Sequence, residues 1–470
     1  MIDVKARARR YASWKRNVAS ASTFVVICGF VAALYFFYRL VLIAAPIVAI
    51  EQSVFNPPST AQIVCQDQDE EGKLQDPQPL LSLAYQNRIR QQKPITSNGV
   101  SNADLSQVDS YTGDPVGYSH SIDDDSASYQ YLTEKSDDTK FLRVTNTKQR
   151  SNGQLSPAWE MDPVAISPDM KTYAYSFWYR STVPVHVSTE YTADTRTRYG
   201  DVMTLDATDT WKQFTAHFDN NDKATTFRVD INSTGVGQVD TKGLDVHKIA
   251  NAKLNKGIVT VTFDDGWESI KTKALPLLEK YGIRSTEFII TEVAAHKVPG
   301  YMTYGEIAKL KAAGQEIGSH SLTHCNQTEL SPSLLEDNAV KSKQALEQQK
   351  LGPIKTFAYP LGEYNKKTQA VYEKQYPLIR TSIAGYNDRY YDETNIHSMA
   401  IANDTSDAAF ETWLSYAETH RLWLVLVYHR VDETGQYSMT SQQFEQQLKM
   451  IQKSGLGIMT MSEAAAAARK

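Results

Sequence analysis

Polar or turn-forming residues follow four separate apolar runs of the sequence, each at the point where the run ends. In chain order they are Asp264 with Asp265, His320 with His324, the segment Tyr-Pro-Leu-Gly at 359–362, and His429. Any one of them is a weak signal, because Asp-Asp-Gly is commonly a turn and two histidines four apart commonly lie on a surface. Together, at the ends of predicted strands, they indicate one catalytic site.

The types and spacing of these residues suit hydrolysis assisted by a metal ion. On a helical turn, the spacing of four would place His320 and His324 on one face, and a carboxylate from another strand would complete three ligands with open positions left over. A metal ion there would acidify a water molecule and polarise a carbonyl group, as attack on an amide or ester requires. If the strand geometry persists, Asp264 and Asp265 point in alternate directions, so one could bind the metal while the other takes the proton of the water. His429 could protonate the leaving group.

The elements that would position these residues are strands alternating with amphipathic helices after residue 255. Predicted strands cover 258–263, 286–290, 356–359 and 422–428, and a short Glu-Ile-Gly strand precedes His320. Predicted helices cover 270–281, 304–313, 333–349 and 366–375. This alternation is typical of a parallel sheet, open or closed into a barrel, with its site at the carboxyl ends of the strands.

Four motifs of this region, taken in order, resemble those of the NodB-type polysaccharide deacetylases, carbohydrate esterase family 4. The motifs are Thr-Phe-Asp-Asp-Gly at 262–266, His-Ser-Leu-Thr-His at 320–324, Tyr-Pro-Leu-Gly at 359–362 and Leu-Val-Tyr-His at 426–429. The first two are highly specific, and the resemblance covers about residues 255–470. It implies a distorted, incomplete (β/α) barrel that removes N-acetyl or O-acetyl groups from a glycan.

The resemblance also implies a role for each polar residue of the motifs. Asp264 would be the general base and His429 the general acid. A divalent metal, zinc in the first place with cobalt or nickel as alternatives, would be bound by Asp265, His320 and His324.

Further residues are candidates for contacts with the substrate. The same resemblance implies that the backbone amide of Leu361 donates to the oxyanion, and Tyr359 and Trp267 are the other candidates. Trp267 could equally be a packing residue. Cys325, next to a predicted ligand, is expected to be structural, because a fourth protein ligand would close the metal site to its substrate.

The sequence departs from the family where the base and the acid should be held in place. Many members carry an arginine two residues before the motif proline, where it fixes the base, and this position is Ala358 here. In this respect the chain resembles the subgroup of biofilm poly-N-acetylglucosamine deacetylases. The partner of the base is therefore unassigned, and no clean fourth motif orients His429. Candidates for that role are Asp388, Asp392 and Asp404.

Short strands with period-two alternation fill the preceding region, 111–250. The clearest lie at 173–179, 185–187, 211–218 and 225–231. This pattern predicts an all-β sandwich, jelly-roll-like, in which the tyrosines of 173–179 face the core and Trp178 faces away. The region loosely resembles carbohydrate-binding modules. Aromatic residues in such strands are more often core than sugar ligands, so no sugar-binding residue is predicted.

The first 110 residues are predicted to be a tail, a membrane anchor and a stalk. Residues 1–22 have a net charge of +5, which leaves −10 for the other 448 residues of a chain with a net charge of −5. The segment 23–50 is apolar apart from Arg39 and long enough to cross a bilayer. The basic flank predicts a cytoplasmic tail at 1–22, a transmembrane helix at 23–50 and a stalk at 51–110 outside the cell. The alternative is a cleaved signal peptide, which the length of the apolar run disfavours.

Composition narrows the function classes further. A content of 41% hydrophobic and 22% charged residues is ordinary for globular domains, the acidic remainder disfavours a nucleic-acid partner, and three cysteines exclude a disulfide scaffold. The sequence therefore predicts a membrane-anchored extracellular enzyme that deacetylates a glycan such as poly-N-acetylglucosamine, chitin or peptidoglycan. An esterase acting on acetylated xylan and a catalytically inactive glycan-binding surface protein are the alternatives.

Overall fold

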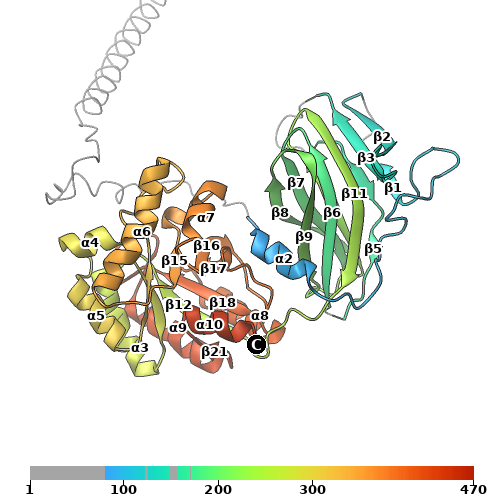
Figure 1. The fold of residues 1–470 in the computed structure, drawn as a ribbon. Coiled ribbons are helices and arrows are strands. Elements are labelled where there is room, and N and C mark those ends of the chain that lie inside the picture. The colour runs from blue at the N-terminus through green and yellow to red at the C-terminus, as the bar shows by residue number, and fades with distance from the viewer. Residues whose placement is uncertain (1–79, 122–124, 149–155, 170) are drawn as a thin grey trace, which may run out of the picture. The chain divides into compact units, whose positions relative to one another are not determined.

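The structure is a computed structural model that describes residues 80–121, 125–148, 156–169 and 171–470. The predicted tail, transmembrane helix and first part of the stalk lie outside these residues. Within the described ranges, no helix is both long enough and apolar enough to span a bilayer. An all-β region comes first along the chain, and a barrel of alternating strands and helices follows it (Figure 1).

Two antiparallel sheets make up the all-β region. The five-stranded sheet has the order β2 (Ala127–Thr133), β3 (Lys140–Asn146), β11 (Gly237–Lys248), β6 (Thr172–Ser181) and β9 (Thr208–Asp219). The four-stranded sheet has the order β5 (Val164–Ala165), β10 (Thr226–Ser233), β7 (Val185–Ala193) and β8 (Arg196–Leu205). A separate short pair joins β1 (Tyr118–His120) to β4 (Trp159–Met161).

One hydrophobic core lies between the two sheets. Tyr175 and Phe177 of β6 are buried in it, and the ring of Tyr175 lies 5.4 Å from that of Phe227 on β10, in the other sheet. On the opposite face of β6, Trp178 is 38% exposed. The alternation expected for this strand is therefore present, because successive side chains of a strand point to opposite faces. The resemblance of the region to carbohydrate-binding modules stays a prediction.

The segment 80–110, which the sequence pattern assigned to a stalk, belongs to the folded part of the chain. It contains α2 (Leu83–Arg90). Its buried apolar residues, which join the core of the all-β region, are Tyr85, Ile89, Val100 and Leu105. These residues are few and irregularly spaced, so they form no periodic pattern in the sequence. The prediction of a stalk up to residue 110 is therefore wrong for this segment.

Seven parallel strands form a closed barrel after residue 255. In order they are β12 (Ile258–Phe263), β13 (Ser285–Ile289), β14 (Glu316–Ser319), β15 (Thr356–Ala358), β16 (Leu378–Ala384), β17 (Ile396–Ala400) and β18 (Trp423–Tyr428). The ring closes because β12 pairs with both β13 and β18, and β21 (Gly457–Ile458) adds to the start of β12. The barrel thus has seven strands instead of the usual eight, but it is not left open.

Helices connect the strands and surround the barrel, as Figure 1 shows. They are η3 (Ile270–Ala274) with α3 (Leu275–Tyr281), α4 (Thr291–His296), α5 (Tyr304–Ala312), α6 (Pro332–Gln348), η4 (Pro360–Gly362), α7 (Lys366–Tyr372), α8 (Asp407–His420), α9 (Ser441–Lys453) and α10 (Met461–Ala468). Two short strands, β19 (Arg430–Val431) and β20 (Ser438–Met439), pair with each other after β18. Met461 and Ala464 of α10 pack with Ile258 and Trp423, which fills the barrel near the strands' amino ends.

Strand β12 shows how the sequence places a functional residue. Val261 and Phe263 pack in the cluster formed with the surrounding helices. The alternate residues face the barrel interior, where the indole of Trp423 donates to Oγ1 of Thr260 at 2.9 Å. Position 264 continues this interior series, because side chains alternate along a strand. Asp264 therefore enters the barrel at its carboxyl end.

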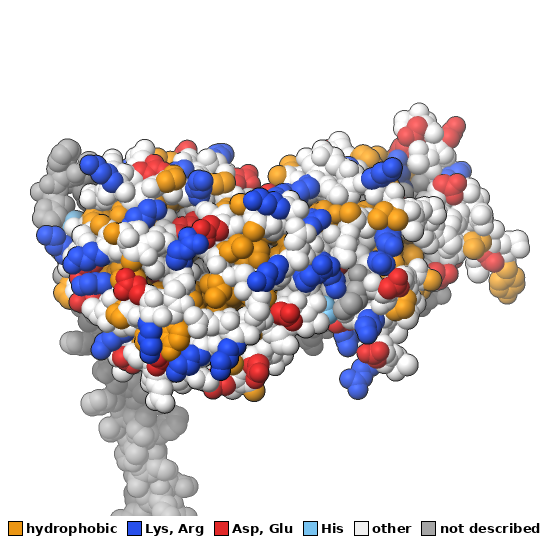
Figure 2. All heavy atoms as spheres, turned by 90° about the horizontal axis from the view of Figure 1, so that it is seen from below, with side chains coloured by type: hydrophobic (Ala, Val, Ile, Leu, Met, Phe, Trp, Pro, Cys, Tyr) orange, Lys and Arg blue, Asp and Glu red, His pale blue; other side chains and the backbone are white. Residues whose placement is uncertain are grey.

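Acidic and basic side chains are interspersed on the face of the molecule drawn in Figure 2. No continuous basic surface is visible on that face.

Candidate active site

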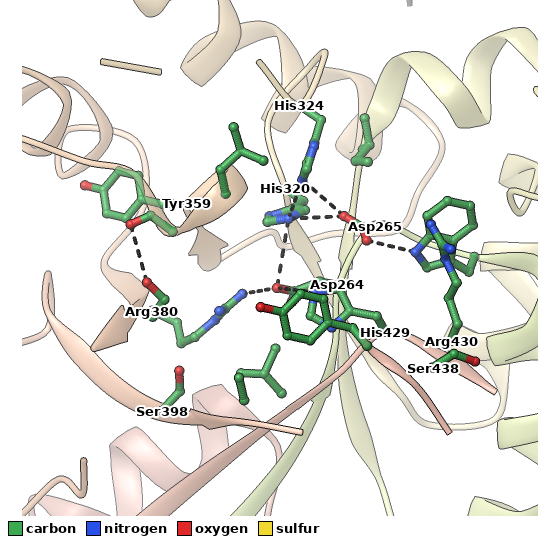
Figure 3. A pocket seen from close by; sticks show the side chains of 18 of the residues that line it. Asp264, Asp265, His320, His324, Tyr359, Arg380, Ser398, His429, Arg430 and Ser438 are labelled. Carbon is green, nitrogen blue, oxygen red and sulfur yellow. Dashed lines mark hydrogen bonds and ion pairs between the residues drawn. The ribbon is translucent and has the colours of Figure 1, made fainter. Parts of the chain in front are cut away.

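Three ligand atoms converge at the carboxyl end of the barrel (Figure 3). Oδ1 of Asp265, Nε2 of His320 and Nε2 of His324 all lie within 4.8 Å of one another. Nε2 of His324 is 3.2 Å from Oδ1 of Asp265 and 3.1 Å from Nε2 of His320. All three residues are buried. They are the residues that the sequence predicted as metal ligands, and the structure brings them together.

This donor set fits a divalent metal ion. Oδ1 of Asp265 is buried and accepts no hydrogen bond from the described residues, as expected for an atom that faces a cation. Nδ1 of His320 lies 2.9 Å from the carbonyl oxygen of Ala358. Because a carbonyl can only accept, Nδ1 carries the proton, and a neutral ring keeps the lone pair of Nε2 for a metal. Two imidazoles and a carboxylate with open positions are a common set for catalytic zinc and related metals.

The charge of Asp265 suits the same role. Burial would raise the pKa of its carboxyl group, but a proton on Nε2 of His320 or His324, at the place that a cation would take, outweighs burial and holds the pKa well below its ordinary value. The carboxylate is therefore ionised at neutral pH and ready to bind a cation.

The two histidines lie in a loop after β14 and not on a helical turn. The loop folds back because Ser321 and His324 both adopt left-handed conformations, with φ of 70° and 60°. Oγ of Ser321 accepts a hydrogen bond from the backbone N–H of His324 at 3.0 Å. The helical interpretation of the spacing is therefore wrong, although its consequence, two adjacent imidazoles, is present.

Asp264, the predicted base, is held by an arginine inside the barrel. Nη2 of Arg380 lies 2.5 Å from Oδ2 of Asp264, and the two side chains are only 4% and 5% exposed. Nε2 of His320 and Nε2 of His429 lie 3.9 and 4.0 Å from the same oxygen. The other oxygen, Oδ1, is buried and accepts no hydrogen bond within the described residues. One carboxylate oxygen is thus fixed by Arg380 and the other is left to take a proton.

Arg380 is the functional residue that the sequence analysis missed. It lies on β16, directly beside Ala358 of β15 in the strand register. A neighbouring strand therefore supplies the arginine that the family pattern places at 358. One signal for it was present, because an arginine within an apolar run is rarely buried unless it has an anionic partner.

His429, the predicted acid, follows β18 and lines the cavity that Asp264 and Asp265 also line. Its ring lies 4.9 Å from that of Tyr437, with the two planes at 30°. Nδ1 of His429 has no hydrogen-bond partner within the described ranges. Burial lowers the pKa of His429, although the charges of Asp265 and Asp264 oppose this effect. A lower pKa makes the protonated ring a stronger acid but a scarcer one at neutral pH.

None of the three aspartates considered as its orienting partner contacts His429. Asp388 binds Nε2 of His217 at 2.5 Å, and Asp392 accepts from the backbone N–H of Ser82 at 2.5 Å. Asp404 is exposed. Within the described residues, the side chains that the structure places next to His429 are Tyr437, by ring contact, and Asp264, whose Oδ2 lies 4.0 Å from Nε2.

All three residues predicted to contact the substrate line the cavity, but the ring of Tyr359 belongs to the core. Leu361 lines the cavity, which has a volume of about 140 Å³, and has a φ of 60°. Tyr359 also lines it, but its ring stacks on Tyr364 at 4.9 Å and is 1% exposed, so the phenol is a core side chain. Trp267 lines the cavity as well, with its ring stacked on Tyr301 at 4.1 Å.

Cys325 is disulfide-bonded and therefore offers no thiolate to a metal. The other two cysteines of the sequence, Cys28 and Cys65, lie outside the described residues. The structural role expected for Cys325 agrees with this bond.

The buried carboxyl group of Glu287 on β13 should make the stability of the fold depend on pH. Burial, together with the charge of Asp264, raises the pKa of its carboxyl group from 4.5 to about 8, although Ser285 donates a hydrogen bond to it. Between these two values the folded chain holds a proton that the unfolded chain has released, so stability falls as the pH rises. Glu287→Gln removes this effect. In urea unfolding, the free energy of unfolding of the variant minus that of the original chain should increase from pH 5 to pH 8. The increase should be on the order of a few kcal/mol.

Glu445 provides the matched control for this measurement. Hydrogen bonds from Lys280 and Tyr281 lower its pKa to about 2, so it is ionised in both states across this pH range. The stability difference between Glu445→Gln and the original chain should therefore stay constant from pH 5 to pH 8. An equally constant difference for Glu287→Gln would contradict the prediction.

Comparison with known proteins adds a family to this geometry. Residues 251–377 match the family model described as polysaccharide deacetylase. Bacillus subtilis YxkH, provisionally named a polysaccharide deacetylase, is 25% identical over 185 residues, which are 39% of this chain and 66% of YxkH. The peptidoglycan-N-acetylglucosamine deacetylase PgdA of Listeria monocytogenes is 27% identical over 164 residues, 35% of this chain and 33% of PgdA. The chain therefore spans less than two thirds of either relative.

Among solved structures, the Streptococcus pyogenes deacetylase PplD in complex with acetate aligns with a TM-score of 0.32 and 23% identity, over 33% of this chain and 68% of that one. The family match includes Asp264, Asp265, His320 and His324. Arg380 and His429 lie beyond its end.

Proposed function

We propose that the barrel, whose residues 251–377 match the family model described as polysaccharide deacetylase, hydrolyses acetyl groups of a glycan, N-acetyl groups in the first place. The observation that supports this most strongly is the convergence of an acid, a base and a metal-binding set on one cavity. The residues concerned are Asp264, Asp265, His320, His324 and His429. An inactive glycan-binding protein would have no need of all five together.

Three of these residues prepare the site for a cation. Asp265, His320 and His324 would hold a divalent metal, zinc in the first place. Such a metal supplies a Lewis acid that lowers the pKa of water and polarises a carbonyl group.

The remaining residues move protons around the acetyl carbon. Oδ1 of Asp264 takes a proton from the attacking water, while Arg380 holds Oδ2 so that the carboxylate keeps its orientation. The backbone N–H of Leu361 donates to the developing oxyanion. The carbon–nitrogen bond then breaks, and His429 protonates the leaving nitrogen, which gives acetate and a free amine on the sugar.

The cellular setting belongs to the same proposal. The apolar segment 23–50 would anchor the chain in a membrane, with the barrel outside the cell. The substrate would then be an exterior polysaccharide such as poly-N-acetylglucosamine, chitin or peptidoglycan. The name of PgdA gives peptidoglycan some preference within this group.

The test is acetate release from chitooligosaccharides, peptidoglycan fragments and acetylxylan, each with and without a chelator. We expect release from the N-acetylated substrates, its loss on chelation, and its return when zinc is added. Release from acetylxylan alone would replace the amidase proposal with an esterase. Release from none of the three would contradict the enzymatic proposal and favour a glycan-binding protein.

A further inference from the structure

Three side chains form a stack at the rim of the cavity, and we call them the Trp267 stack. The ring of Trp267 lies 4.1 Å from that of Tyr301, with the planes at 27°. The guanidinium carbon of Arg430 lies 3.8 Å from the centre of the Trp267 ring. Two groups so close to one ring centre cannot share a face, so Tyr301 and Arg430 cover opposite faces of the indole. No face is left for a sugar ring to stack on, which favours the packing alternative for Trp267.

The free edge of the indole points at a metal ligand. Nε1 of Trp267 donates a hydrogen bond to Oδ2 of Asp265 at 2.8 Å. Oδ1 of the same carboxylate faces His320 and His324. The two oxygens are thus divided between the indole and the metal site. An indole N–H can only donate, so Trp267 occupies one carboxylate oxygen and cannot itself bind the metal.

The backbone near Asp265 fixes the position of this residue but not the rotation of its carboxylate. Asp265 and Gly266 have φ of 72° and 83°, which defines a tight turn at the end of β12. The turn is tied to the next loop because the N–H of Met302 donates to the carbonyl of Gly266 at 2.9 Å. The rotation of the carboxylate depends on its contacts, and the hydrogen bond from Trp267 is the contact that holds Oδ2.

We propose that Trp267 is a positioning residue for the metal: clamped between Tyr301 and Arg430, it holds Asp265 so that only Oδ1 meets the cation. The inference rests on the metal site of the proposed function but not on the reaction. One-oxygen binding leaves more positions open for water and substrate than two-oxygen binding does. Arg430 directly follows His429 in the chain, so the same short segment carries the acid and one half of the clamp.

Trp267→Phe is the variant that tests this inference, because it keeps an aromatic ring in the stack and removes only the N–H group and the second ring. Metal-free full-length protein is titrated with Zn²⁺ in competition with a chromophoric chelator. Loss of a hydrogen bond to a ligand typically weakens metal binding about 10- to 100-fold, and we expect a change of this size. Trp178→Phe, in the all-β region, is the matched control and should bind Zn²⁺ as the original chain does.

A second readout reports the geometry of the site directly. The visible absorption spectrum of the Co²⁺-loaded protein should change in Trp267→Phe and stay the same in Trp178→Phe. Arg430→Gln leaves the N–H group in place but removes half of the clamp, so it should weaken Zn²⁺ binding less than Trp267→Phe does. It also keeps the test decisive if Trp267→Phe fails to fold, because unchanged affinity in Arg430→Gln would then overturn the inference.

Equal Zn²⁺ affinity and an unchanged Co²⁺ spectrum in folded Trp267→Phe would overturn it as well, and so would failure of the original chain to bind either metal. None of these measurements uses a substrate. A chain whose metal affinity depends on Trp267 but which releases no acetate would contradict the proposed function and leave this inference standing.

Discussion

Replacing Asp264 by Asn is expected to lower kcat on an N-acetylated oligosaccharide by about 10²- to 10⁴-fold, the usual contribution of a general base. The amide still offers an oxygen to Arg380, so the buried contact between positions 264 and 380 is kept, but it cannot take a proton from water. The three predicted metal ligands are untouched. Zinc bound per chain, measured on the same preparation, should therefore equal that of the original protein.

Asp404→Asn is the matched control for this prediction, because the same change is made at an exposed aspartate outside the cavity. This variant should keep both turnover and metal. Full activity in Asp264→Asn would refute its assignment as the base. Loss of zinc in Asp264→Asn would show instead that the carboxylate at 264 belongs to the metal site.

Replacing His324 by Ala is expected to remove the metal and, with it, acetate release. Loss of a ligand should weaken Zn²⁺ binding by more than the 10- to 100-fold typical for loss of a hydrogen bond to a ligand. His296→Ala, which removes a partly exposed histidine paired with Glu292 on α4, should change neither quantity. Unaltered metal content in His324→Ala would mean that this imidazole is not a ligand.

The convergence of the three candidate metal ligands could be predicted because their signals are local. Strand β12 is an apolar run that ends in Asp-Asp-Gly, and the parallel arrangement brings the ends of such strands to one rim. The loop that carries His320 and His324 could not be predicted in detail. Its course depends on left-handed conformations at Ser321 and His324. Glycine is the residue that normally indicates such a conformation in a sequence, and neither position is a glycine.

The partners of Asp264 and His429, the predicted base and acid, could not be predicted because they come from distant parts of the chain. Arg380 meets Asp264 only through the register of β15 with β16, and no motif records that pairing. Tyr437 reaches His429 from the segment between β19 and β20, as part of no recognisable pattern. Trp267 directly follows the Asp-Asp-Gly motif in the sequence. Its proposed positioning role depends on Tyr301 and Arg430, which come from other segments and cover its ring.

The boundary of the all-β region was missed for a related reason. Tyr85 and Ile89 lie on one short helix, and Val100 and Leu105 lie on irregular chain, so no period joins them. Their burial is decided by the sheets that they pack against. Composition alone, which does not include these contacts, therefore predicts a stalk for this segment.

The metal site can be observed directly in an anomalous-diffraction map from crystals of the protein grown with Zn²⁺, with data collected on both sides of the zinc edge. We expect one strong peak in contact with Oδ1 of Asp265 and Nε2 of both His320 and His324, with Asp264 and His429 beside it but not bound. A map with no peak among these atoms, or with the zinc held by other residues, would contradict the assignment of Asp265, His320 and His324 as metal ligands.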